Sequence, residues 1–130
     1  MIVKRTRSEK GQTMVETAIA LPVILLILFA ILEFGIVFRD YLALTDAVRV
    51  GARKGAVSRE LPDPVGATAA AVRNSGQDLG PALQVQVVPA APWAPGADVT
   101  VTGRYPYSID VLGLVVSSGW LTSSTTERIN

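Results

Sequence analysis

The feature that most constrains this chain is a long apolar run near its N-terminus. Residues 14–38 are mostly apolar, and Thr17–Leu32 contains no charged side chain. As a helix, that uncharged stretch would be roughly 24 Å long, slightly short of the ~30 Å hydrocarbon core of a membrane. Apolar residues on both sides, Met14-Val15 and Phe34–Phe38, make the run long enough. The run therefore predicts one membrane-spanning helix, with its membrane part at about residues 14–38.

The helical pattern extends beyond the apolar run at its C-terminal end. Apolar and charged residues alternate up to about residue 57 without a proline, so we expect one long helix over residues 12–57. Pro22 lies inside it and removes a backbone donor, which predicts a local kink. Gly51 and Gly55 form a small-x-x-x-small spacing that permits close helix packing. We expect this spacing to pack against the following domain, with a dimer contact as the alternative.

Residues 58–130 are expected to form a small α+β domain. Asp63 followed by Pro64 is a typical helix start, and it predicts a helix over 65–74 that stops at Gly76. Alternation of apolar and polar residues predicts strands at 83–88, 98–105 and 120–128, with a proline-rich loop at 89–96. Residues 109–118 fit either a short helix or an irregular apolar loop. The expected fold is thus a long N-terminal transmembrane helix followed by one helix and about three antiparallel strands.

Composition excludes several classes of function. The chain of 130 residues has no cysteine and no histidine, so disulfides, thiolate or imidazole metal sites, cysteine nucleophiles and Ser-His triads are excluded. Residues 60–130 carry three arginines against six acidic residues, a net charge of −3 that disfavours nucleic-acid binding. No catalytic constellation stands out. We therefore expect a protein that is not an enzyme and that uses no metal or cofactor.

Two residue sets have a functional and a structural interpretation. Four aromatic residues in the domain fit a sugar-binding patch or, as we expect, anchors for the core and loops. They are Trp93, Tyr105, Tyr107 and Trp120. Three carboxylates, Asp98, Asp110 and Glu127, lack the spacing of a calcium loop and are expected to be solvated.

The junction between a basic leader and the apolar run carries the strongest functional signal. Residues 1–11 hold four basic residues and one acidic residue, a net charge of +3. Glu16 lies near the N-terminal end of the apolar run, where placing a carboxylate close to lipid costs free energy. Cleavage between Gly11 and Gln12 would make Glu16 the fifth residue of a new N-terminus. The charged amino group of Gln12 on a neighbouring subunit would then be a partner for Glu16 and would select the register between subunits.

The rest of the sequence offers no alternative cleavage site and does not decide the orientation of the helix in the membrane. The end of the apolar run, Leu32–Phe38, offers no small-residue cleavage site of the signal-peptide type. Glu33 is expected at the level of the lipid headgroups. Basic residues are tied at four on each side of the run, so the positive-inside rule does not decide the orientation. Processing at Gly11 on the cytoplasmic face would decide the orientation of the helix. It would place residues 1–11 in the cytoplasm and residues 39–130 on the other side of the membrane.

These residues resemble the TadE-like family of pilin-like proteins. The resemblance covers residues 11–23, the Glu33-Phe34-Gly35 segment, residues 47–53 and, in outline, the closing Thr122–Glu127. It implies a minor pilin or pseudopilin of a tight-adherence (Flp-type) pilus used in surface attachment. It also implies a single-pass protein of the bacterial inner membrane with a cytoplasmic N-terminus and an extracytoplasmic domain, incorporated into a surface pilus or confined to its assembly complex.

The same resemblance assigns partners and residue roles. A prepilin peptidase would cleave after Gly11, and Glu16 would be the processing and assembly glutamate. The lipid bilayer, other pilin or pseudopilin subunits and the tight-adherence secretion machinery would be the remaining partners. Independently of the resemblance, we expect Pro22, Glu33 and Gly35 to contribute to membrane and helix packing. Major Flp pilins are very short and usually have tyrosine after the glutamate, whereas Thr17 and a whole domain follow here, which favours a minor subunit. The alternative is a signal-anchored extracytoplasmic binding module outside any fibre.

Overall fold

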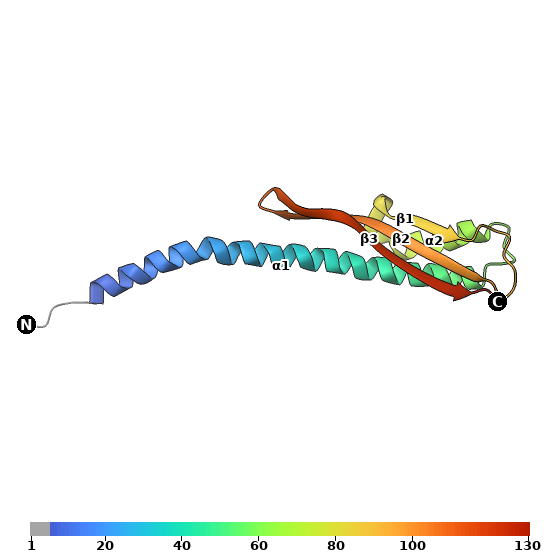
Figure 1. Ribbon diagram of the computed structural model, residues 1–130, viewed down its shortest axis with the longest axis horizontal. Coiled ribbons are helices and arrows are strands. Elements are labelled where there is room, and N and C mark those ends of the chain that lie inside the picture. The colour runs from blue at the N-terminus through green and yellow to red at the C-terminus, as the bar shows by residue number, and fades with distance from the viewer. Residues whose placement is uncertain (1–5) are drawn as a thin grey trace, which may run out of the picture.

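The computed structural model describes residues 6–130, with side chains from residue 9 onward. Residues 1–5 of the expected leader, including Lys4 and Arg5, lie outside the described residues. Helix α1, Thr6–Ala56, is 51 residues long and forms the long axis of the molecule (Figure 1). It begins six residues before the expected start at residue 12 and runs through Gly11 without a break. One glycine costs only about 1 kcal/mol of helix propensity, which does not end a helix of this length.

Pro22 lies inside α1. Figure 1 shows the helix axis bending within its blue N-terminal third, the part that contains this proline. The proline ring removes an amide donor and crowds the carbonyl one turn earlier, which is the usual cause of such a bend.

Helix α2, Pro64–Ser75, forms where the sequence predicts it. The Asp63 carboxylate accepts a hydrogen bond from the Gly66 amide at 2.8 Å and caps the first turn. The helix ends at Gly76, whose amide donates to the Val72 carbonyl at 2.9 Å. A short 3-10 segment, η1 at Gln77–Ala82, follows and was not expected from the sequence.

Replacing Asp63 with alanine is expected to lower the free energy of unfolding of the domain by about 1 kcal/mol, because the first turn of α2 loses its cap. Thermal unfolding of the full chain in detergent, followed by circular dichroism, measures this. Asp78→Ala is the matched control, since Asp78 is exposed in the first turn of η1 and caps nothing there. Equal losses of stability in the two variants would contradict the assigned cap.

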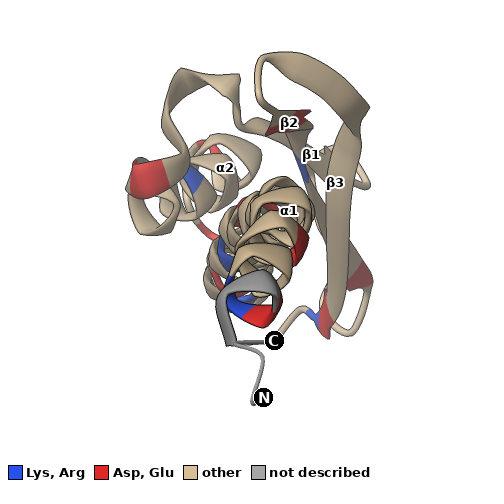
Figure 2. Cartoon of the chain, turned by 90° about the vertical axis from the view of Figure 1, so that its left-hand side faces the viewer, with Lys and Arg blue, Asp and Glu red and all other residues tan. Residues whose placement is uncertain are grey.

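The three strands form one antiparallel sheet in the order β1-β2-β3. They are β1 at Gln84–Val88, β2 at Asp98–Val111 and β3 at Leu114–Arg128. Viewed along α1, the helix lies with α2 on one side and the sheet on the other (Figure 2). The core is formed by Leu44, Ala47, Val48 and Ala52 of α1 together with residues of α2 and the sheet, including Val72 and Val101. The expected α+β fold is confirmed.

Residues 109–118 are neither a helix nor an irregular loop, so both expectations for this segment are wrong. They complete a β-hairpin in which β2 and β3 are longer than the sequence predicts. Val111 pairs with Leu114, and the two residues between them, Leu112 and Gly113, have φ angles of 52° and 83°. Positive φ at both positions fits the twist of a two-residue hairpin turn. Leucine rarely adopts this conformation, so the usual Asn-Gly signal is missing.

Candidate membrane and assembly site

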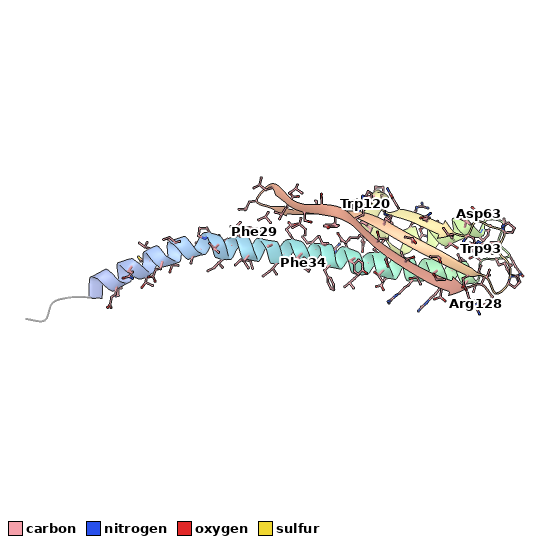
Figure 3. The ribbon with its side chains drawn as sticks, viewed as in Figure 1. Phe29, Phe34, Asp63, Trp93, Trp120 and Arg128 are labelled. Carbon is pink, nitrogen blue, oxygen red and sulfur yellow. The ribbon has the colours of Figure 1, made fainter. Side chains whose placement is uncertain are left out.

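The N-terminal part of α1 is not covered by any other element that the structure describes. Among the described residues, one helix, Glu9–Ala56, is long and apolar enough to cross a membrane. The mean hydropathy of its 18-residue apolar window is 2.8, and none of that window is buried. Its large apolar side chains between Met14 and Phe38 are exposed, with few exceptions, and project from all sides of the helix (Figure 3). This segment is therefore compatible with a single-pass membrane anchor.

The predicted processing junction lies on an open part of α1. A side chain at Gly11 would meet none of the described atoms within 4 Å, and Gln12 and Glu16 are exposed. The side-chain amide of Gln12 donates a hydrogen bond to a carboxylate oxygen of Glu16, one helical turn away, at 3.2 Å. Among the side chains that the structure describes, Glu16 forms no ion pair. The carboxylate is thus available for a cationic partner from another chain.

The second glutamate of the apolar segment has different surroundings. Glu33 is 17 residues from Glu16, roughly 25 Å along the helix, and is partly shielded. It lies one turn before Val37, on the face of α1 that is turned toward the β2–β3 hairpin. Gly35, by contrast, is exposed, and a side chain there would meet nothing within 4 Å. Its predicted packing role therefore has no partner among the described residues of this chain.

An apolar groove of about 500 Å³ separates α1 from the β2–β3 hairpin. Its lining is mostly aromatic and aliphatic, from Phe34, Val37, Phe38 and Tyr41 on the helix and Tyr107, Ile109, Ser117, Trp120 and Leu121 on the hairpin. No local sequence pattern predicts this groove, because its lining combines residues of α1 with residues of both hairpin strands.

The two glycines at the C-terminal end of α1 lie against the domain. A side chain at Gly51 would overlap Val72 of α2, and one at Gly55 would lie 3.2 Å from the Thr68 hydroxyl and 3.3 Å from Val99. The small-x-x-x-small spacing thus lets α1 approach α2 and the sheet closely. These positions are covered within a single chain.

Gly51→Ala is expected to lower the free energy of unfolding by about 1–3 kcal/mol, because the added methyl group forces α1 and α2 apart. Chemical denaturation in detergent measures the loss. Gly35→Ala makes the same change in the same helix at an open position and is expected to leave the midpoint of domain unfolding unchanged. If the two variants unfold alike, helix contact at Gly51 does not limit the stability of the domain.

The four aromatic residues do not form one patch. Trp93 is buried and its indole donates to the Pro89 carbonyl at 2.9 Å, which anchors the loop before β2. Tyr105 packs against the main core, and Tyr107 lines the groove. Trp120 is partly exposed, with the Arg104 guanidinium 5.0 Å from its ring centroid. Tyr107 and Trp120 thus share one groove, whereas Trp93 lies apart from them as a loop anchor.

The three carboxylates considered for calcium are also apart. Asp98 pairs with Arg128 at 3.4 Å at one end of the β2–β3 ladder, whereas Asp110 lies near the hairpin turn at the other end. Within the described residues, no group of three acidic side chains comes close enough to hold a metal ion.

These features define a class of protein, namely a small α+β domain built on the C-terminal half of an apolar helix that is compatible with a single-pass anchor. Residues 11–53 match the model of the TadE-like protein family, which confirms the resemblance for this part of the chain. The match begins at Gly11 and ends within α1 at Arg53. Comparisons with curated proteins and with solved structures returned no match.

Proposed function

We propose that this protein is a non-enzymatic minor pilin or pseudopilin of a tight-adherence pilus. It is anchored in the bacterial inner membrane by α1, cleaved between Gly11 and Gln12, and assembled with other pilin-like subunits. The observation that carries the proposal is the family match that begins at Gly11, five residues before an exposed carboxylate at the start of an uncovered apolar helix. In this arrangement the leader is cytoplasmic and the domain is extracytoplasmic.

The geometry of the junction supports cleavage and assembly. Gly11 is the weakest helix former of its turn, so the surrounding backbone unwinds at low cost for a peptidase. After cleavage, the amino group of Gln12 and the Glu16 carboxylate lie at the same end of the helix. When neighbouring helices exclude water, that carboxylate pairs with the amino group of an adjacent subunit. Removing one member of a buried charge pair costs about 3–5 kcal/mol, which is enough to set the register.

N-terminal sequencing of the protein from cells that express the pilus system tests this proposal. The expected mature sequence begins Gln12-Thr13-Met14-Val15-Glu16. Cells that lack the prepilin peptidase are the control and are expected to retain the 11-residue leader. A mature N-terminus after Phe38 would instead indicate secretion by a conventional signal peptide and would contradict the pilin assignment.

A further inference from the structure

The tip of the β2–β3 hairpin, residues 111–116, is an exposed apolar surface. Leu112, Leu114, Val115 and Val116 are all more than half exposed, Leu114 at 73%. Residues 61–130 expose seven large apolar side chains, and four of them lie in this short tip. Such a concentration is unusual on a water-facing surface and indicates an apolar partner.

The tip extends back along α1 toward its membrane segment. Figure 1 shows the hairpin projecting beyond the rest of the domain, and in Figure 3 its turn reaches the axial level of Phe29. Ile109 lines the same groove as Phe34 and Phe38. Val111, the last residue of β2, is two residues further along the strand, roughly 7 Å closer to the N-terminal end of α1. The apolar tip and the apolar segment of α1 therefore lie at the same position along the axis of α1.

The positions of the charged side chains agree with a common membrane boundary. A hydrocarbon core of about 30 Å that begins at Met14 ends about 20 residues later, near Phe34. Asp110 is exposed at the base of the tip, beside Ile109, and so lies near the level of Glu33. Between Asp110 and Glu127 the chain carries no charge. Both carboxylates thus lie at the headgroup level when the tip enters the apolar layer.

We propose that residues 111–116 insert into the outer leaflet of the membrane that α1 spans, so that the protein contacts lipid at two places. This inference rests on the proposed anchoring by α1. Only the turn and its flanking residues insert, since the free edges of a longer hairpin would leave backbone groups without partners in hydrocarbon. The second contact restrains rotation of the domain about the axis of α1.

Site-specific fluorescence tests the insertion, and the absence of cysteine makes each label unique. Leu114→Cys in the tip, Ile27→Cys in the helix and Thr122→Cys further along β3 are labelled with an environment-sensitive dye. Each full-length chain is reconstituted into vesicles of phosphatidylethanolamine and phosphatidylglycerol. The accessibility of each label is then measured by the quenching of its fluorescence with nitroxide-bearing lipids and with aqueous iodide.

The label at Leu114 is expected to shift its emission to shorter wavelength and to lose most of its fluorescence to nitroxides near the headgroups. The label at Ile27 is expected to respond to deep nitroxides, and the label at Thr122 to iodide alone. A tip label that responds like Thr122, while Ile27 lies in lipid, overturns the hairpin inference and leaves the anchor intact. Protection of Leu114 from both quenchers that disappears on dilution of the protein in lipid also overturns it, since a second protein then covers the tip. An aqueous Ile27 overturns the anchoring and the hairpin inference together.

Discussion

Gly11→Ala is expected to abolish processing and leave the leader attached to the whole population of the protein. The structure separates this effect from folding, because a side chain at Gly11 would meet nothing within 4 Å and α1 is already continuous there. Alanine also stabilises the helix by roughly 0.5–1 kcal/mol, which makes unwinding at the scissile bond less favourable. Immunoblotting and N-terminal sequencing of cells with an active pilus system measure the processed fraction.

Gly35→Ala is the matched control for this experiment, since Gly35 is equally open in the same helix. It is expected to be processed like the unchanged protein. Normal processing of Gly11→Ala would refute the assignment of Gly11–Gln12 as a prepilin cleavage site.

Glu16→Gln removes the carboxylate while keeping the size of the side chain and is expected to lower incorporation of the protein into pili.

Leu44→Ala is expected to produce the largest loss of stability, about 2–5 kcal/mol. Leu44 is 0% exposed, and its side chain covers the backbone of Gly103, where an added Cβ would lie 2.8 Å from the leucine Cδ1. The residue thus joins α1 to the centre of the sheet. Because small domains have marginal stability, a loss of this size unfolds much of the population. Thermal unfolding by circular dichroism in detergent and limited proteolysis of the domain measure it.

Leu42→Ala makes the same substitution two residues earlier on α1, where the side chain is 51% exposed. It is expected to leave the domain nearly as stable as the unchanged protein. A similar loss in both variants would show that helix propensity, and not packing against the sheet, dominates the stability of this region.

Local signals predicted most of the secondary structure. The uncharged run Thr17–Leu32 predicted an apolar helix, Asp63-Pro64 predicted the start of α2, and strict alternation predicted β1 and the first part of β2. Each signal works over a few neighbouring residues, through capping, helix propensity or side-chain alternation. The hairpin turn has no such signal, since Leu112 occupies a conformation that favours glycine or asparagine.

For the candidate site, the sequence alone predicted the residues of the junction and the apolar segment, because both are continuous in the chain. It did not determine which face of α1 enters the core: Leu42 and Leu44 are both apolar, yet only Leu44 is buried. The tertiary structure alone shows which face of α1 is buried. It also shows that the hairpin lies alongside α1 and that a groove lined by Phe34 lies between them. The reason is physical, since these features depend on contacts between residues far apart in the chain, such as Leu44 with Gly103, and no local pattern encodes them.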